Sequence, residues 1–244
     1  MKYSILFAVV FLACCLTEGA QQPNIVLFLV DDMGWMDCGV YGSKYYETPH
    51  MDKLAKQSML FTDAYAHPLC SPTRACLLTG RNHHSVGMRA LANFDTGYPN
   101  MRGRIARSAG TMAEMVCGEG FATWAVGKWH LTPMREASAV GPFGDWPLQR
   151  GFDRYYGFMQ GETDQFHPEL YEDNRLVDVP RTPEEGYHVS EDLVDHAIDL
   201  VRTQHTMVPE RPFFLYLAFG ATHAPHQAPD DYLQKWRGRF DDGW

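Results

Sequence analysis

Several features are missing from this sequence of 244 residues, and each absence argues against a class of protein. No basic cluster occurs, and 21 Lys and Arg stand against 30 Asp and Glu, which disfavours a protein that binds duplexes through phosphate contacts. No Asn-x-Ser/Thr sequon, internal repeat or low-complexity segment is present. Because 45% of the residues are hydrophobic, we expect a folded chain with one large α/β domain or two small ones.

The first twenty residues differ in composition from the rest and predict a secretory signal peptide over residues 1–20. Lys2 precedes an apolar stretch over residues 5–16, and residues 17–20 offer small side chains for cleavage. The stretch is about twelve residues long, whereas a membrane-spanning helix needs roughly twenty. A lipid anchor on Cys14 or Cys15 is disfavoured, because the residues just before them fit a lipoprotein cleavage site poorly. We expect a soluble protein that is secreted, periplasmic or lysosomal, with no membrane span.

Four cysteines follow this peptide: Cys38, Cys70, Cys76 and Cys117. In an oxidising compartment they allow two disulfides, and a Cys70–Cys76 pair across one helical turn is one alternative. If one cysteine does chemistry instead, the remaining number is odd and at least one thiol stays unpaired. The pairing does not follow from the sequence.

Apolar runs alternate with helix signals, which predicts a doubly wound α/β domain with a mostly parallel sheet and helices on both faces. Residues 24–30 and 213–219 are continuous apolar runs, typical of strands covered on both faces, and residues 121–126 are a weaker run. Residues 131–189 show little periodicity and predict an elaborated loop region, with a hairpin that turns at Asp173–Asn174.

Three helix starts are signalled between these runs. Thr48 followed by Pro49 predicts a cap and a first helical position. Thr111 and Glu114 form a capping-box pattern. Ser190 is predicted to cap a third helix, whose apolar face would be Val194, Ala197, Ile198 and Val201.

Two aspartates come directly after the first apolar run, where open α/β sheets bind their ligands. Asp31 and Asp32 are adjacent, so their carboxylates repel each other unless a cation lies between them. A hard divalent cation would use these oxygens as ligands, provided that the chain bends, since neighbours on a straight strand point to opposite faces. The alternative is a pair of turn-forming residues.

Basic side chains follow the other two runs. Lys128 and His130 stand at i, i+2 spacing, which on an extended segment directs both to one side. Taken alone, Lys128 also fits an ordinary surface lysine, and His130 also fits a core histidine with a hydrogen-bond partner. His223 follows the third run and is a weaker signal, because His226 is an equal candidate on composition.

The strongest local signal is a helix N-terminus beside Cys70. Ser71 suits the N-cap, Pro72 suits the first helical position and Gly80 suits the end. Cys70 would then lie where exposed N–H groups and the helix dipole favour an anion, and Arg74, one turn further on, would reinforce this site. A tyrosine-phosphatase loop is excluded, because it needs an arginine six positions after the cysteine.

The segment CSPTRACLLTGR resembles the signature of the sulfatase family, in which a Cys-x-Pro-x-Arg core marks a cysteine that becomes formylglycine. The segments NIVLFLVDDMGW, TPHMDKLAKQSMLFTDAYAHPLCSPTR, GKWHL, RGFDRYYGF and THAP also resemble the family, in the same order. The resemblance covers almost everything after residue 20, and within the family the sequence is most similar to bacterial-type arylsulfatases. It implies an alkaline phosphatase-like fold and a formylglycine-generating enzyme as a partner during maturation.

The resemblance also implies a metal centre at the modified cysteine. Asp31, Asp32 and an oxygen of the residue made from Cys70 would bind a divalent cation, Ca²⁺ rather than Mg²⁺. Arg74 would neutralise and position that residue. The substrate implied is a sulfate ester, cleaved through a hydrated formylglycine.

Three further residues receive roles from the same resemblance. Lys128 and His223 would hold sulfate oxygens, with His223 near the leaving group, and His130 would bond the second hydroxyl of the hydrated aldehyde. The loop over residues 91–108, with Arg102 and Arg104, is a candidate for specificity, although a packed surface loop explains it equally well.

Two aspartates supply at most four of the six to eight oxygens that calcium takes. The family completes its site with residues beyond the stretch matched here, so we interpret residues 21–244 as the N-terminal part of a longer catalytic domain, inactive alone. Two alternatives remain open: a phosphonate or phosphodiester hydrolase of the same superfamily, and a truncated product with a binding role.

Overall fold

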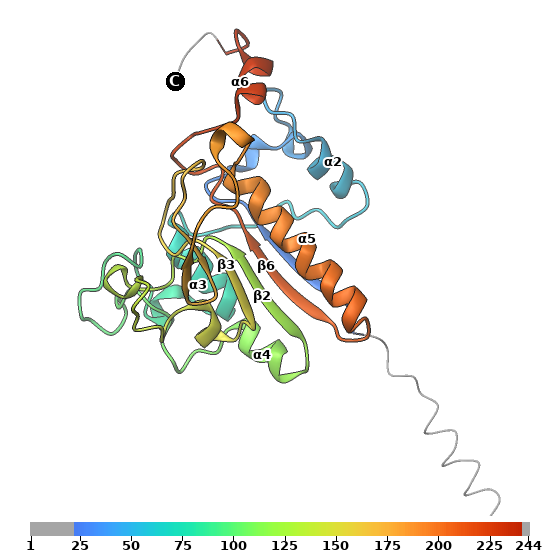
Figure 1. Cartoon of the computed structure of the whole chain (residues 1–244). Coiled ribbons are helices and arrows are strands. Elements are labelled where there is room, and N and C mark those ends of the chain that lie inside the picture. Colours follow the sequence, from blue (N-terminus) through green and yellow to red (C-terminus); the bar gives the residue numbers. More distant parts are fainter. Residues whose placement is uncertain (1–21, 241–244) are drawn as a thin grey trace, which may run out of the picture.

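One six-stranded sheet forms the centre of the molecule (Figure 1). The computed structural model describes residues 22–240, so the predicted signal peptide lies outside the described residues. The strand order is β1-β6-β2-β3-β4-β5, with parallel pairing from β1 to β3 and antiparallel pairing of β4 and β5. The predicted α/β class with a mostly parallel sheet is therefore confirmed. The strands are β1 (Ile25–Leu29), β2 (Ala122–Gly127), β3 (Arg154–Gly157), β4 (Leu170–Glu172), β5 (Arg175–Val177) and β6 (Phe213–Ala218).

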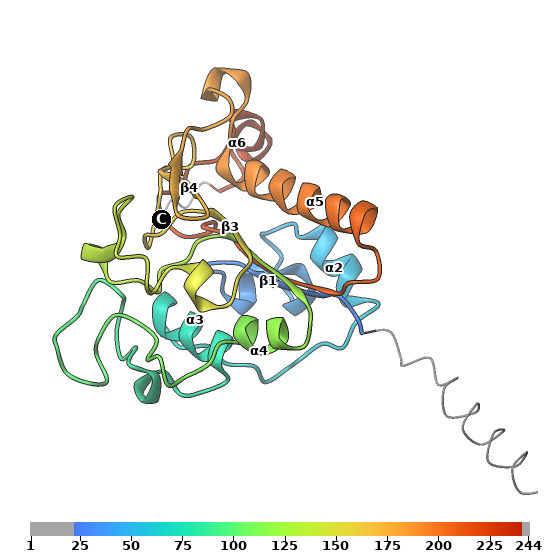
Figure 2. The ribbon, with the colours of Figure 1, turned by 60° about the horizontal axis from the view of Figure 1, so that its bottom comes forward.

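Helices cover both faces of this sheet. Figure 2 shows α5 on one side of the strands and α3 and α4 on the other. The described helices include none with the length and apolar character of a membrane-spanning segment. The α-helices are α2 (Pro49–Ala55), α3 (Cys70–Thr79), α4 (Met112–Gly118), α5 (Val189–Met207) and α6 (Asp230–Trp236). The 3₁₀ helices are Trp35–Asp37, Gly39–Tyr41, His83–Val86, Met134–Glu136, Pro147–Arg150 and Pro183–Glu185.

Two apolar clusters fill the spaces on either side of the sheet. On one face, Ala75 and Leu78 of α3 pack with Phe214 and Tyr216 of β6. On the other face, side chains of α5 pack with the opposite side chains of β2 and β6, because neighbours along a strand point to opposite faces. The continuous apolar runs of β2 and β6 are buried throughout, as predicted.

Strand β1 is covered less than its apolar run predicted. Its burial alternates, and Val26 and Phe28 are 54% and 53% exposed. The reason is that α5 packs on β2, β3 and β6, so that face of β1 has no helix over it among residues 22–240. The expectation that both faces of this strand are covered is wrong for the described chain.

The helix starts follow local capping rules with one correction. The Thr111 hydroxyl accepts from the Glu114 N–H at 3.1 Å and the Glu114 carboxylate accepts from the Thr111 N–H at 2.8 Å, so the capping box is confirmed. Helix α5 starts two residues earlier than predicted: His188, not Ser190, is its N-cap and accepts from the Ser190 N–H. Of its predicted apolar face, Val194, Ala197 and Val201 pack in the apolar cluster on this side of the sheet, whereas Ile198 is exposed.

The long loop region contains the expected hairpin and one strand that was not predicted. Strands β4 and β5 pair antiparallel around the turn at Asp173, whose φ is 57°. Strand β3, by contrast, is only four residues long and carries no distinct pattern. Its place beside β2 depends on residues far away in the chain, which explains why local periodicity missed it.

Candidate active site

Helix α3 presents Cys70 as its first residue rather than as the residue before its cap. Leu69 occupies the N-cap with extended backbone angles, and Gly80 ends the helix in the left-handed conformation. The predicted cap, Ser71, is instead buried and accepts a hydrogen bond from the Ala92 N–H at 3.1 Å. Cys70 therefore lies at the helix N-terminus, as expected, while the capping prediction is wrong.

The four cysteines that the structure describes are all free thiols, so the Cys70–Cys76 alternative is not observed. Cys70 instead contacts a histidine: its Sγ lies 3.1 Å from Nδ1 of His130. The two residues come from α3 and from the segment after β2, sixty positions apart.

The opposite nitrogen of His130 contacts Asn93. Nε2 of His130 lies 2.8 Å from Oδ1 of Asn93, and an amide oxygen only accepts, so Nε2 carries the proton. Nδ1 then faces Cys70 with its lone pair. Burial, together with Lys128, Arg74 and His223, lowers the pKa of His130 to about 3, so the imidazole is neutral at physiological pH.

A buried charge cluster lies beneath this pair. The Asp31 carboxylate, 5% exposed, pairs with Nζ of Lys128 and, at 3.3 Å, with Nη2 of Arg74. Nη1 of Arg74 donates to the Lys128 carbonyl at 2.8 Å and to the Tyr216 hydroxyl at 3.1 Å. Asp31, Lys128 and Arg74 thus form one connected group under Cys70.

The two cations of this cluster respond differently to their surroundings. Burial and the neighbouring Arg74 lower the pKa of Lys128, against the opposing effect of Asp31. Burial would lower the pKa of Arg74 as well, but Tyr216 and Asp31 outweigh it, so the Arg74 pKa lies above its usual value. The site therefore keeps a fixed positive charge one helical turn from Cys70.

The backbone geometry of the strand ends brings these side chains together. Asp32 has a φ of 55°, which gives the bend that the aspartate pair requires. His130 has a φ of 54°, so the segment with Lys128 is not extended as predicted, although both side chains reach the site. Gly127 has a φ of 107°, and a Cβ there would clash with the Ala218 carbonyl of β6. Only glycine fits at position 127, where β2 and β6 lie so close together, and Lys128 follows directly after it.

The loop after β6 brings His223 to the same edge of the sheet. The Asp31 N–H donates to the Ala221 carbonyl at 3.0 Å, and the Thr222 N–H donates to the Asp31 carbonyl at 2.7 Å. Nε2 of His223 lies 3.6 Å from a carboxylate oxygen of Asp32. All seven predicted site residues therefore form one connected set.

A cavity of about 350 Å³ opens at this set, and Asp31, Asp32, Cys70 and Arg74 all line it. The donor chemistry, carboxylate oxygens beside position 70, is that of a hard divalent cation. The donor number is short: within residues 22–240, no group of three or more His, Cys, Asp or Glu is placed to hold a metal ion. The described residues therefore fit one side of a cation site.

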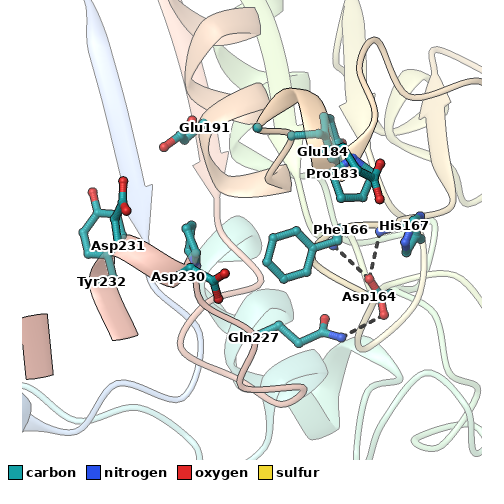
Figure 3. Close-up of a pocket in the computed structure, with 13 residues that line it drawn as sticks. Asp164, Phe166, His167, Pro183, Glu184, Glu191, Gln227, Asp230, Asp231 and Tyr232 are labelled. Atoms are coloured by element: carbon teal, nitrogen blue, oxygen red, sulfur yellow. Dashed lines mark hydrogen bonds between the residues drawn. The ribbon is translucent and has the colours of Figure 1, made fainter. Parts of the chain in front are cut away.

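A larger cavity of about 730 Å³ lies between the start of α5 and the loop before α6 (Figure 3). Its wall contains none of the predicted site residues and carries carboxylates that would repel a sulfate: Asp164, Glu184, Glu191, Asp230 and Asp231. Gln227 donates to the Asp164 carboxylate (dashed line in Figure 3), with a distance of 2.8 Å between the atoms, and it also accepts from the Gln165 N–H at 2.7 Å. These bonds anchor the loop that carries His223.

Two residues of the site were missed by sequence reasoning. Tyr216 stands inside an apolar strand, where a lone hydroxyl among hydrophobic residues is a weak signal of a buried partner. Asn93 lies in a loop without periodicity, and its contact with His130 spans 37 positions. Nothing local in the sequence points to that contact.

Comparisons with known proteins agree on one family. The family described as Sulfatase matches residues 23–244. N-acetylgalactosamine-6-sulfatase from Rattus norvegicus is 38% identical over 245 residues, covering 93% of this chain and 45% of that protein. Arylsulfatase from Klebsiella aerogenes is 29% identical over 238 residues, covering 92% of this chain and 48% of that protein.

The chain is also similar to a solved structure. The crystal structure of Ps i-CgsB in complex with k-i-k-neocarrahexaose matches with a TM-score of 0.74 and 31% identity, covering 89% of this chain and 49% of that one. The chain spans about half the length of these relatives.

Proposed function

Because this chain belongs to the sulfatase family, we propose that the full-length protein hydrolyses sulfate esters at the site around Cys70. One observation carries the proposal: Sγ of Cys70, at the start of α3, lies 3.1 Å from the free nitrogen of a neutral His130. The fixed charge of Arg74 lies one turn away and suits an anionic group.

We propose further that Cys70 is converted to formylglycine by a formylglycine-generating enzyme. A thiol that attacked sulfur would form an adduct with no easy exit. An aldehyde that has added water carries two hydroxyls on one carbon, so one can accept the sulfuryl group and the other can release it.

In the first step, one hydroxyl of the hydrated residue 70 attacks the sulfur atom. The new S–O bond forms as the S–O bond to the alcohol or phenol breaks, and the proton of the attacking hydroxyl passes to the departing oxygen, beside which we place His223. Lys128 and His223 hold the oxygens of the transferring group.

In the second step, Nδ1 of His130 takes the proton of the remaining hydroxyl. The aldehyde forms again, the C–O bond to the sulfate breaks, and sulfate leaves. His130 returns its proton to solvent, and addition of one water restores the hydrate. The net reaction consumes one ester and one water and releases one alcohol, one sulfate and one proton.

Asp31 and Asp32 would hold a divalent cation, calcium by the chemistry of their oxygens, with the other ligands supplied from outside residues 22–240. When bound, such a cation supplies positive charge that favours the ionised hydroxyl and the sulfate oxygens. The buried Nε of Arg74 has no hydrogen-bond acceptor within the described part of the chain, so this donor is available to an oxygen at position 70.

The named relatives act on or hold sugars: one is named N-acetylgalactosamine-6-sulfatase, and another is described in complex with k-i-k-neocarrahexaose. By this similarity we propose a sulfated carbohydrate as the substrate class, with aryl sulfates as convenient probes. The N-terminal composition supports a secreted, periplasmic or lysosomal location.

The test replaces the proposed nucleophile in the full-length protein. Cys70→Ala should reduce turnover of an aryl sulfate by about a thousandfold or more, because no hydrated aldehyde can form. Cys76→Ala, in the same helix, is the matched control and should retain turnover. Appreciable activity of Cys70→Ala would refute the assignment.

Two further measurements separate the alternatives. Mass spectrometry of the tryptic peptide with position 70 should show the decrease that accompanies conversion of a thiol to an aldehyde. Turnover of a sulfate and a phosphate ester of the same phenol should favour the sulfate, whereas a preference for phosphate would indicate a phosphodiester or phosphonate hydrolase.

A further inference from the structure

A third cavity, of about 340 Å³, adjoins the proposed base. Asn93, Asp95 and Arg135 line it, together with Ala92, Pro133 and Met134. Asn93 accepts from His130 on one side and forms the wall of this cavity on the other. A group bound in the cavity would therefore be separated from His130 by the Asn93 side chain.

Two arginines converge on one carboxylate in the wall of this cavity. Oδ1 of Asp95 accepts from Nε of Arg102 at 3.2 Å, and Oδ2 accepts from Nη2 of Arg135 at 2.7 Å. The Asp95 side chain is 8% exposed, whereas those of Arg102 and Arg135 are 44% and 59% exposed. The negative charge is thus underneath, and the guanidinium groups face outward.

The neighbouring carboxylates are covered in the same way. Arg104 donates to Asp145 at 2.6 Å and to Glu136 at 2.5 Å, and both acidic side chains are nearly buried. Arg135 also pairs with Glu136 at 3.4 Å, and Arg107 lies 3.9 Å from Asp145, so four arginines stand against three carboxylates around this cavity. The surface beside the cavity is positive, on a chain whose formal net charge is -9.

Guanidinium groups held in fixed positions bind planar or tetrahedral anions well, because each presents several N–H donors in a rigid fork. Arg102 and Arg135 each use part of their donors for Asp95 and keep the others toward solvent. Asp95 fixes their orientation, which reduces the entropy lost when an anion binds.

We propose that Arg102 and Arg135 form a subsite for a second acidic group of the substrate, a sulfate or a carboxylate. This inference rests on the proposed function, since the subsite adjoins His130. It makes the substrate a polyanionic molecule, such as a carbohydrate with two sulfates or with one sulfate and one uronate, rather than a neutral alcohol with one sulfate.

A purely structural role of the two arginines predicts something different. Arg135 and Asp95 also join the Met134–Glu136 turn to the loop over residues 91–108. If that were their whole purpose, removing Arg135 would affect every substrate alike. Comparison of substrates with one and two acidic groups separates the two roles.

The experiment uses the full-length protein and three esters of one sugar core, with a single sulfate, with a second sulfate, or with a carboxylate in place of the second sulfate. Arg135→Gln and Arg102→Gln should each lower kcat/KM for the doubly charged esters about two- to fivefold, the effect expected of one partly exposed charge contact. The value for the singly charged ester should stay the same. Arg154→Gln is the matched control, because Arg154 is 49% exposed and also pairs with two carboxylates, Glu172 and Asp173.

The outcomes are distinguishable. Loss confined to one doubly charged ester would identify the acidic group that the subsite takes, and added salt should reduce the difference between wild type and variant. Equal loss on all three esters, or no loss on any, would overturn the subsite while leaving the proposed function intact. If wild type cleaved none of the esters, the proposed function itself would fail.

Discussion

Asn93 determines which nitrogen of His130 faces residue 70. Its amide oxygen accepts from Nε2 at 2.8 Å, which leaves the lone pair of Nδ1 directed at Cys70, 3.1 Å away. Since the pKa of His130 is lowered to about 3 by burial and by the nearby Lys128 and Arg74, the ring is neutral and needs a partner to select its tautomer. Asn93 acts through His130 and is a positioning residue.

Asn93→Ala should lower kcat of the full-length protein on an aryl sulfate by about tenfold, because His130 loses the partner that orients it. KM should change less, since no group that holds the sulfate is removed. Asn100→Ala, an exposed residue of the same loop, is the control and should leave both constants unchanged. Steady-state kinetics would contradict the role if the two variants behaved alike.

At the scale of elements, a buried polar cluster fixes α5 to the sheet. The Asp192 carboxylate of α5 accepts from the hydroxyls of Tyr156, at 2.7 Å, and Tyr187, at 3.0 Å, and pairs with His196 at 3.2 Å. Tyr156 belongs to β3 and its ring stacks on His196. The helix is therefore held on the sheet by polar as well as apolar contacts.

The charges of this cluster depend on one another. Burial would lower the pKa of His196, but the hydrogen bond and charge of Asp192 outweigh it and raise the pKa above its usual value. Burial would raise the pKa of Asp192, but bonds from His196, Tyr156 and Tyr187 lower it. The ion pair therefore stabilises the folded protein at pH values above the usual pKa of an aspartate. This contribution falls as the pH rises through the pKa of His196.

His196→Gln should consequently destabilise the protein more at about pH 5.5 than at about pH 9, because only the protonated imidazole forms the ion pair. Urea unfolding at the two pH values measures the difference. In an Asp192→Asn background the same change should cost equal free energy at both values. A pH-independent effect in the wild-type background would show that the pair contributes nothing.

At the scale of the whole molecule, the strand order assembles the site. Strand β6 is late in the chain but inserts between β1 and β2. These three parallel strands end at the same edge of the sheet, so the segments that follow them all begin there. Asp31, Lys128 and His223 reach one place for this reason, and α3 adds Cys70 and Arg74 from one face. The anchor of Gln227 on Asp164 holds the third segment there.

Calcium should stabilise the full-length protein, because an ion held by Asp31 and Asp32 binds the folded state and not the unfolded chain. At a concentration about a hundredfold above its dissociation constant, one bound ion adds about 2.7 kcal/mol to the free energy of unfolding. Calorimetry with calcium and with a chelator measures this gain. Asp32→Asn should abolish most of it, whereas Asp63→Asn, an exposed aspartate, should retain it. An equal calcium effect in both variants would exclude Asp32 as a ligand.

The agreement between sequence and structure depends on the range of the contacts. The runs that became β1, β2 and β6, the Thr111 capping box and the hairpin at Asp173 were predicted from patterns a few residues long. The errors have the same origin: the cap of α3 and the exposed face of β1 were decided by residues elsewhere in the chain. The Ser71 hydroxyl accepts from the Ala92 N–H instead of capping its own helix, and α5 does not extend over β1.

By itself the sequence determined the α/β class, the polar residues that follow each strand and the helix that carries Cys70, because these depend on local backbone preferences and on the periodicity of burial. Only the tertiary structure decided that β6 lies between β1 and β2, that Asn93 orients His130 and that Arg102 and Arg135 meet at Asp95. The sheet order and the contact with His130 join residues far apart in the chain, and the meeting at Asp95 depends on how an aperiodic loop is packed. A one-dimensional pattern contains no information on such distances.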